Sequence, residues 1–290
     1  MTPSTAESSP VQLRDLVREG HTLGLQRLDA QMLLLHAMGR NPHDRAWLVA
    51  HDTDTPNPTA TTLIRQLYQR RAMGEPVAYL LGQREFHGLT LRVDARVLDP
   101  RPDTETLVDW ALDCLQNRAA PLALDLGTGS GAIALALQHK RPDARIWGLD
   151  ASPDALAVAQ HNAATLKLPV RFLHGHWLSN WADPAPQRFD LIASNPPYIS
   201  ETDPHLATLT HEPRQALVSG PDGLADIRLI VAQAPRHLQS GGWLLLEHGF
   251  EQAQAVAALL QQQGFAQISH RADLAGHLRC TGGCWTPPPA

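Results

Sequence analysis

The segment that most constrains the fold is a short apolar run that leads through a glycine loop into a helix. The run spans residues 122–126, the loop carries Gly127, Gly129 and Gly131, and a helical pattern begins at Ala132. Further strands are predicted at residues 145–149, 170–173, 189–194 and 243–247. Further helices are predicted at residues 224–238 and 251–263, and the residues after 263 can form two more strands. This alternation predicts an α/β fold with a mostly parallel, doubly wound sheet that binds ligands at the carboxyl ends of its strands.

The glycine loop has the composition of a nucleoside site. Glycines permit positive φ and let a ligand approach the backbone closely. Asp150 ends the next strand, where a carboxylate can accept hydrogen bonds from two ribose hydroxyls. The spacing G-x-G-x-G differs from the G-x-G-x-x-G of dinucleotide sites, so it disfavours an NAD oxidoreductase and favours a nucleoside without a pyrophosphate, such as S-adenosylmethionine. Asp125, two residues before the first glycine, could then face the positively charged methionine portion.

The tetrapeptide Asn195-Pro196-Pro197-Tyr198 follows the strand predicted at residues 189–194. Two prolines can simply stop a strand, but this loop lies at the edge of the sheet where ligands bind. The NH₂ group of an amide or an aromatic ring is a poor nucleophile, because its lone pair is delocalised. The side-chain oxygen of Asn195 and the backbone carbonyl of Pro196 can hold its two hydrogens, and Tyr198 can pack against its planar group. We therefore predict Asn195, Pro196 and Tyr198 as catalytic residues.

These motifs together resemble the amino-methyltransferases, and further segments resemble one branch of them, the PrmC/HemK family of release-factor glutamine methyltransferases. The segments that carry this resemblance are Arg70-Arg71 with Gly74-Glu75-Pro76, Glu85-Phe86, the stretch from Pro100 to Glu105, His211-Glu212-Pro213 with Ala216-Leu217, and the stretch from Leu244 to Gly249. The resemblance covers residues 10–280. It implies a Rossmann-like class I methyltransferase domain, a small helical N-terminal domain, S-adenosylmethionine as cofactor, and the glutamine of the GGQ motif in class I peptide chain release factors as substrate.

The resemblance also implies roles for individual residues. The implied cofactor contacts are Asp125, Gly127, Thr128, Gly129, Ser130, Gly131, Asp150, Trp177 and Asn195. The implied substrate contacts are Asn195, Pro196, Pro197, Tyr198, Arg101, Pro102 and Glu105. Similar proteins often carry an acidic residue just before Trp177 that can accept the adenine amino group, and here that residue is His176. A neutral imidazole can still accept one hydrogen bond, but it does so without a full charge. Glu247-His248, at a strand end, is interpreted as a pair that supports the site.

Three regions are predicted along the chain: a helical substrate-recognition domain over residues 1–80, a β-hairpin connector over 81–105, and the methyltransferase domain over 106–290. Leucines at spacings of three and four, including Leu23 and Leu28, predict helices that Gly20 interrupts, and a helix at residues 60–73 groups Leu63 with Leu67 and Tyr68. Thr104 is predicted to cap a helix that runs to residue 116, and Ser152-Pro153 to begin another.

Charge and cysteine content narrow the alternatives. The formal net charge is −5 and residues 1–100 carry no excess of basic groups, which disfavours a DNA adenine-N6 methyltransferase, although such enzymes share the NPPY motif. A ribosomal-protein glutamine N5-methyltransferase is a closer alternative, and the stretch at 101–105 favours the release-factor branch over it. The intact loops argue against a non-catalytic nucleoside-binding protein. The three cysteines fit no disulfide framework or zinc pattern. We expect a cytoplasmic monomer that has no metal site, membrane segment or stable nucleic-acid binding.

Overall fold

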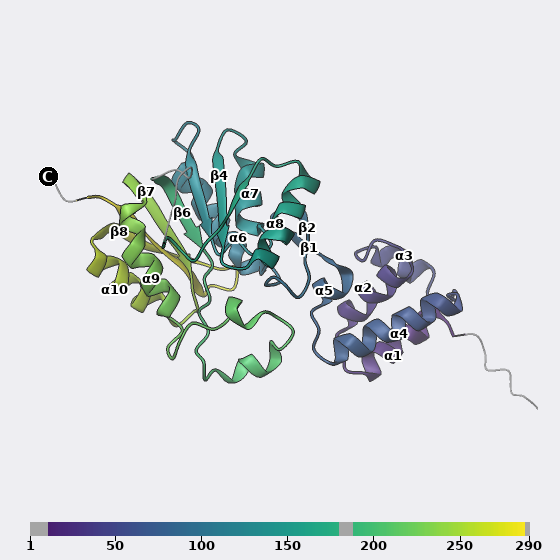
Figure 1. Cartoon of the computed structure of the whole chain (residues 1–290). Coiled ribbons are helices and arrows are strands. Elements are labelled where there is room, and N and C mark those ends of the chain that lie inside the picture. The colour runs from purple at the N-terminus through teal and green to yellow at the C-terminus, as the bar shows by residue number, and fades with distance from the viewer. Residues whose placement is uncertain (1–10, 180–187, 288–290) are drawn as a thin grey trace, which may run out of the picture. The chain divides into compact units, whose positions relative to one another are not determined.

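The computed structural model describes residues 11–179 and 188–287. The chain divides into two compact units, Met1–Gly82 and Gln83–Ala290 (Figure 1). The segment interpreted as a connector, residues 81–105, lies almost entirely in the second unit.

The first unit is helical around a leucine core. Its helices are α1 (Leu13–Thr22), α2 (Arg27–Ala37), α3 (Arg45–Ala50), α4 (Pro58–Ala72) and α5 (Val77–Leu81). Leu13, Leu16 and Leu33 are completely buried. The hydroxyl of Tyr68 on α4 donates a hydrogen bond to the carbonyl of Ala30 on α2, which satisfies the one polar atom of that buried side chain.

Two predictions for this unit were wrong. Gly20 does not interrupt the first helix: a Cβ there would lie 2.9 Å from the Cβ of Ala30, so the glycine lets α1 approach α2 closely. Leu23, Leu28 and Leu63 are exposed and do not belong to the core. Spacing groups Leu23 and Leu28 with the buried leucines and Leu63 with Leu67 and Tyr68, but the packing of neighbouring helices decides which part of an apolar stripe is covered.

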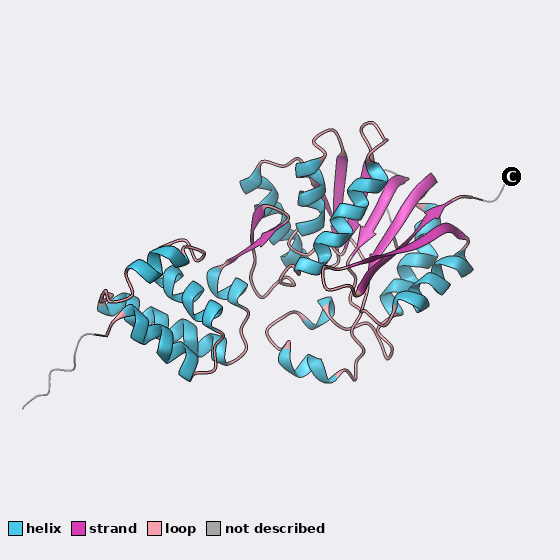
Figure 2. Ribbon diagram, turned by 180° about the vertical axis from the view of Figure 1, so that it is seen from behind, coloured by secondary structure: helices cyan, strands magenta, loops and turns pink. Residues whose placement is uncertain are grey.

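The second unit is built on a seven-stranded sheet. The strand order is β5-β4-β3-β6-β7-β9-β8, and all neighbours are parallel except that β9 runs antiparallel to β7 and β8. The strands are β3 (Leu122–Leu126), β4 (Arg145–Asp150), β5 (Arg171–His174), β6 (Phe189–Ser194), β7 (Leu238–Glu247), β8 (Phe265–Ala272) and β9 (Leu278–Trp285). Figure 2 shows helices on both sides of this sheet. The prediction of a mostly parallel, doubly wound sheet is confirmed.

Each face of the sheet has its own apolar core. One core joins the sheet to α6 (Glu105–Leu115), α7 (Ala132–Lys140) and α8 (Pro153–Leu166), and the other joins it to α9 (Ala225–Gln233) and α10 (Ala253–Gln263). The predicted hairpin, β1 (Gln83–Phe86) and β2 (Leu89–Arg92), is present and contributes Phe86, Leu89 and Leu91 to the first core. The hairpin is therefore an integral part of the second unit.

Asn162 on α8 links the hairpin to the glycine loop. Its side chain accepts a hydrogen bond from the backbone N–H of Arg92 and donates to the carbonyl oxygens of Arg92 and Ser130, at 2.8, 3.0 and 2.9 Å. The side chain is buried, and a buried amide without hydrogen bonds would destabilise the folded protein. These three bonds avoid that loss of stability. The loop therefore has a rigid support on the side of α8.

Several element boundaries differ from those predicted. The strand predicted at 243–247 begins at Leu238, and the helix predicted at 224–238 ends at Gln233, where a 3₁₀ turn containing Pro235 follows. Ser152 caps α8 as predicted, since its hydroxyl accepts from the N–H of Ala155. Thr104 does not cap α6 with its side chain, because it ends a 3₁₀ turn, Pro102–Thr104, with helical φ and ψ.

No helix in the described part of the chain is long and apolar enough to span a membrane.

Packing behind the glycine loop should contribute strongly to stability. Leu135 on α7 is completely buried and lies against Gly131, where a Cβ would be 3.0 Å from its Cδ1 atom. We expect Leu135→Ala to lower the free energy of unfolding by about 2–5 kcal/mol, because it leaves a cavity. Leu229→Ala, on the exposed face of α9, is the matched control and should cost about 0.5 kcal/mol or less. Urea unfolding followed by tryptophan fluorescence measures both, and equal losses would contradict the prediction.

Candidate functional site

The register of three parallel strands brings the predicted motifs to one edge of the sheet. Leu126 at the end of β3 pairs with Leu149 of β4 on one side and with Ser194 of β6 on the other. The next residues along these strands are Gly127, Asp150 and Asn195. Because parallel strands that end at the same level bring their outgoing loops side by side, the glycine loop, the carboxylate and the amide meet at the carboxyl edge.

The glycine loop turns sharply because its glycines adopt positive φ. The angles are +71° at Gly127, +54° at Gly129 and +85° at Gly131, in the region that side chains disfavour. The N–H groups of Gly127 and Thr128 both donate to the carbonyl of Leu149, at 2.8 and 2.9 Å. A Cβ at Gly127 would lie 3.3 Å from the indole of Trp177, whereas one at Gly129 would meet no atom within 4 Å. The first glycine thus makes room for Trp177, and the second leaves open space before the loop.

Asp150 holds the loop from the neighbouring strand. One carboxylate oxygen accepts from the N–H of Gly129 at 2.9 Å, and the other accepts from the N–H of Ser152 at 2.8 Å. Burial raises the pKa of Asp150 above its ordinary value, although these backbone donors oppose the shift. Each oxygen keeps a further lone pair, so the carboxylate can also accept hydrogen bonds from a ligand.

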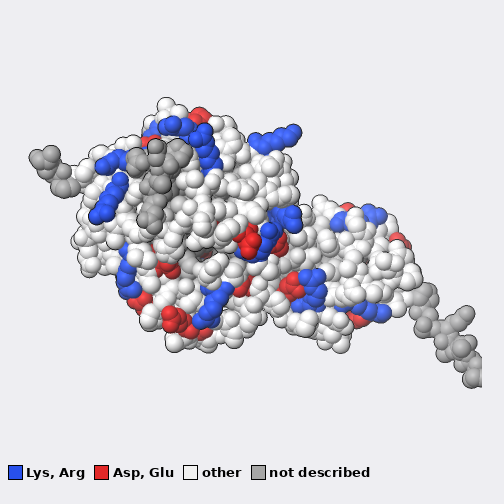
Figure 3. All heavy atoms as spheres, in the orientation of Figure 1, with Lys and Arg blue, Asp and Glu red and all other residues white. Residues whose placement is uncertain are grey.

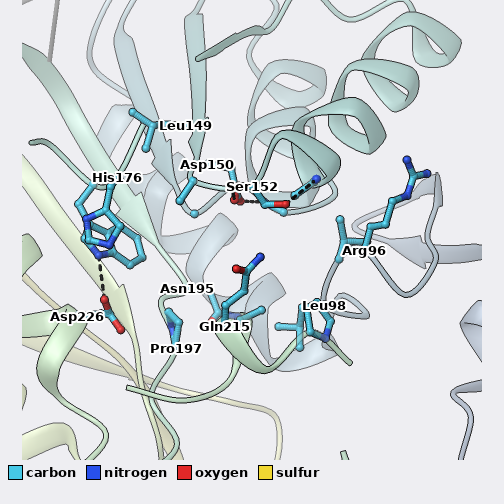
Figure 4. A pocket seen from close by; sticks show the side chains of 18 of the residues that line it. Arg96, Leu98, Leu149, Asp150, Ser152, His176, Asn195, Pro197, Gln215 and Asp226 are labelled. Atoms are coloured by element: carbon cyan, nitrogen blue, oxygen red, sulfur yellow. Dashed lines mark hydrogen bonds between the residues drawn. The ribbon is translucent and has the colours of Figure 1, made fainter. Parts of the chain in front are cut away.

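A cavity of about 260 Å³ opens beside the loop and the carboxylate. Of the predicted cofactor residues, Gly127, Gly129, Asp150, Trp177 and Asn195 line it. Figure 4 shows Asp150 and Ser152 on one side of this cavity and Asn195 and Pro197 on the other. We call it the loop cavity.

The other predicted cofactor residues do not line the loop cavity. They are Asp125, Thr128, Ser130 and Gly131. Asp125 is completely buried behind the loop, where it accepts from the Thr128 hydroxyl at 2.6 Å and from the N–H of Ala134 at 3.2 Å. Burial raises the pKa of Asp125 to about 7. These residues shape the loop from behind, and Asp125 does not line the cavity.

Trp177 forms one wall of the loop cavity and is held by an acidic residue that the sequence analysis missed. Its indole N–H donates to a carboxylate oxygen of Asp226 at 2.9 Å, and the Ser219 hydroxyl donates to the other oxygen at 2.7 Å. Asp226 also lines the cavity, as does His176. Asp226 lies at the start of α9, 49 residues along the chain from Trp177, so no local pattern could have connected the two.

A second cavity, of about 300 Å³, adjoins the first. Arg101, Asn195 and Tyr198 line it, together with residues from the segment 205–217. Arg101 donates to the buried carboxylate of Glu212 at 2.6 Å, and this ion pair ties the segment to the rest of the unit. We call this the tyrosine cavity. Asn195, Leu98 and Ala216 line both cavities, so Asn195 lies at the boundary between them.

The remaining predicted substrate residues lie elsewhere around the site. Pro197 lines the loop cavity, whereas Pro196, Pro102 and Glu105 line neither cavity. The carboxylate of Glu105 accepts from the backbone N–H of His87 at 2.9 Å, so it holds the turn of the hairpin against α6. Holding the hairpin turn is therefore a structural role for Glu105 and an alternative to its predicted role beside the substrate.

Lining residues from three other segments were not identified from the sequence. They are Arg96, Val97 and Leu98 after the hairpin, Pro213 and Gln215 in the segment 205–217, and Ser152 at the start of α8. Ser152 was predicted only as a helix cap, and the segment with Pro213 only carried the family resemblance, so it is the fold that brings these residues to the carboxyl edge of the sheet.

Comparison with known proteins identifies the family. Residues 104–268 match the methyltransferase small domain, and residues 19–82 match the PrmC N-terminal domain. The chain is 50% identical to the release factor glutamine methyltransferase of Bordetella pertussis, over 93% of this chain and 98% of that protein. It is 46% identical to the protein of the same name from Burkholderia pseudomallei, over 97% and 98%.

One solved structure shows the fold independently of close sequence similarity. A methyltransferase from Pyrococcus furiosus superposes with a TM-score of 0.52 at 16% identity, over 77% of this chain and 98% of that chain. The second unit thus has the class I methyltransferase fold, and the chain belongs to the family of release factor glutamine methyltransferases.

Proposed function

We propose that this protein transfers a methyl group from S-adenosylmethionine to the N5 atom of the glutamine in the GGQ motif of class I peptide chain release factors. The observation that carries the proposal is the position of Asn195 at the boundary between the loop cavity and the tyrosine cavity. An amide there can act on a substrate group that enters from one cavity toward a cofactor held in the other. The names of the curated relatives support the choice of substrate.

The loop cavity fits the cofactor by its chemistry. It offers the Asp150 carboxylate to hydroxyl groups, the indole of Trp177 as a flat apolar wall, and open space before Gly129 for close approach. His176 can accept one hydrogen bond from an adenine amino group. The cofactor, when bound, supplies a methyl group on a positively charged sulfur. Gly127, Gly129, Asp150, Trp177 and Asn195 are the residues we assign to its binding.

The substrate amide needs to be oriented more than deprotonated. Its nitrogen lone pair is delocalised into the carbonyl, and its proton becomes acidic only after the methyl group has been added. In the proposed site the Oδ1 atom of Asn195 and the carbonyl of Pro196 accept the two N–H bonds, which turns the lone pair toward the methyl group. The prolines keep these acceptors in place with little reorganisation, and the ring of Tyr198 packs on the planar amide.

The charge distribution supports a protein substrate over DNA. On the face seen in Figure 3, several of the described basic side chains lie beside acidic ones. Ion pairs of this kind join Arg84 to Asp99, Arg101 to Glu212 and Arg228 to Asp222. A duplex backbone is bound by basic groups that are free to pair with phosphates. A monomeric state and a cytoplasmic location remain predictions.

Cofactor binding should depend on Asp150. We expect Asp150→Ala to weaken the binding of S-adenosylmethionine by about 10- to 100-fold, because it removes a charged acceptor and frees the N–H groups of Gly129 and Ser152. Asp143→Ala is the matched control, since Asp143 is an exposed acidic residue near the opposite end of β4. Isothermal titration calorimetry measures both affinities. Equal affinities for the two variants would show that Asp150 does not contribute to cofactor binding.

The choice of substrate is tested by offering the protein tritiated S-adenosylmethionine with a release factor, a ribosomal protein or duplex DNA in separate reactions. We expect label in the release factor alone, and a release factor with GGQ changed to GGA is the control that should stay unlabelled. Label in DNA but not in the release factor would refute the proposed function. Label in the ribosomal protein alone would assign the protein to the other glutamine-modifying activity.

The proposed role of Asn195 in holding the substrate amide is tested by substitution. We expect Asn195→Ala to lower the turnover number by about 100-fold or more, because one of two acceptors for the substrate amide is lost. Cofactor affinity should change by less than about threefold, since other residues of the loop cavity remain. Asn117→Ala, at an exposed position after α6, is the control for handling and folding. Near-normal turnover of Asn195→Ala would show that the hydrogen bond from the substrate amide to Asn195 is not essential.

A further inference from the structure

The side-chain amide of Asn195 is tied at one end to a residue far away in the sequence. Its Nδ2 atom donates a hydrogen bond of 3.1 Å to the hydroxyl oxygen of Thr104, which is buried at the end of the 3₁₀ turn before α6. Among the described residues, none donates a hydrogen bond to the Oδ1 atom of Asn195. The nitrogen end of the amide is thus occupied, and the oxygen end remains available at the boundary of the two cavities.

The carboxyl group of Glu247 lies beside the Thr104 hydroxyl. Glu247 ends β7 and is 1% exposed, and the hydroxyls of Thr104 and Tyr198 are the groups whose hydrogen bonding opposes the rise of its pKa. A threonine hydroxyl has one proton to donate and two lone pairs that accept. When its proton goes to an ionised Glu247, it can only accept from Asn195, so the amide must turn its NH₂ group toward Thr104.

This orientation matters because the two ends of the amide have opposite hydrogen-bonding roles. With Oδ1 toward the cavities, Asn195 accepts an N–H of the substrate amide. With the amide turned over, its NH₂ group would face the substrate NH₂ group, two donors that cannot pair. The substrate would then bind by its own carbonyl oxygen, with its nitrogen turned away from the methyl donor. Such binding occupies the site without reaction.

We propose that Thr104 and Glu247 are positioning residues that determine which end of the Asn195 amide faces the substrate. This inference rests on the proposed function, because it assigns the acceptor role to Asn195. It joins the end of β7 and the 3₁₀ turn before α6 to a loop that follows β6, and neither partner lines the loop cavity or the tyrosine cavity.

The protonation state of Glu247 should make the orientation depend on pH. Burial raises the pKa of Glu247 to about 7. The groups that face it are Asp103 and Thr104 from the 3₁₀ turn, Tyr198 from the loop after β6, and Arg279 and Cys280 from β9. One of its oxygens has no hydrogen-bond partner among the described residues. Below that pKa the carboxyl group is protonated and can donate to Thr104, which frees the threonine proton to turn toward Asn195. Turnover should therefore fall as the pH drops below about 7.

The first experiment compares Thr104→Val with Thr104→Ser. Valine keeps the shape of threonine without the hydroxyl, and serine keeps the hydroxyl. For a release factor substrate we expect Thr104→Val to lower kcat by about tenfold, with KM and the affinity for S-adenosylmethionine changed by less than about twofold. Thr104→Ser should retain at least about a third of the wild-type kcat. A full kcat in Thr104→Val, or an equal loss in Thr104→Ser, would contradict the proposal.

The second experiment follows pH with Glu247→Gln, which cannot ionise. The wild-type kcat should show an acid limb with a midpoint near 7, and the variant should not show it. A limb that persists in Glu247→Gln belongs to another group, such as Asp125, and refutes the role of Glu247. The variant keeps a hydrogen-bonding group of the same size, and its melting temperature checks that it folds.

A readout without substrate separates this inference from the proposed function. In protein labelled with ¹⁵N-asparagine, assigned by comparison with Asn195→Ala, the side-chain NH₂ resonances of Asn195 should shift with a midpoint near pH 7 in the wild type but not in Glu247→Gln. Resonances that do not move would overturn the inference even if the release factor is methylated. If the wild type methylates no release factor, the proposed function fails, and the resonances still report whether Thr104 and Glu247 control the amide.

Discussion

The parallel register of β4, β3 and β6 is the constraint on which the site depends. Leu126 pairs with Leu149 on one side and with Ser194 on the other, so three strands end at one level. Backbone hydrogen bonds alone therefore bring together a glycine loop, a carboxylate and an amide that lie up to 68 residues apart. The Ser194 hydroxyl reinforces this alignment by donating to the carbonyl of Leu126 at 2.7 Å. A shift of register by one residue would move Asn195 out of line with the loop.

Sequence reasoning succeeded where one short segment contains its own signal. The strands Leu122–Leu126 and Phe189–Ser194 are apolar runs that end in a glycine loop and in prolines, and their predicted bounds are those observed. The cap at Ser152 is equally local. The same reasoning failed at Thr104, because its hydroxyl bonds to Asn195, 91 residues away, and does not serve the helix that it precedes. Asp226 escaped notice because it lies at the start of α9, 49 residues along the chain from its partner, Trp177.

Two buried carboxyl groups flank the site, and the burial of each one lowers the stability of the folded state. Asp125 behind the glycine loop and Glu247 at the end of β7 each have a pKa raised by burial to about 7. Neither has an arginine or lysine hydrogen-bonded to it among the described residues; both rely mainly on hydroxyl and backbone donors. A fold selected for stability alone would replace them with apolar groups. Their presence fits a local loss of stability in exchange for the shape and polarity of the carboxyl edge of the sheet.

The packing of the hairpin has a consequence for how such proteins can diversify. Phe86, Leu89 and Leu91 fill the core under α6, and Asn162 binds the backbone of Arg92, so the hairpin folds with the sheet. The division between the units falls at the exposed Gly82, which has a φ of +69°. A recombination event at that glycine would exchange the entire helical unit as a cassette and leave every residue of both cavities on the catalytic side. The joint at Gly82 thus separates the part of the chain that can be replaced from the part that performs the chemistry.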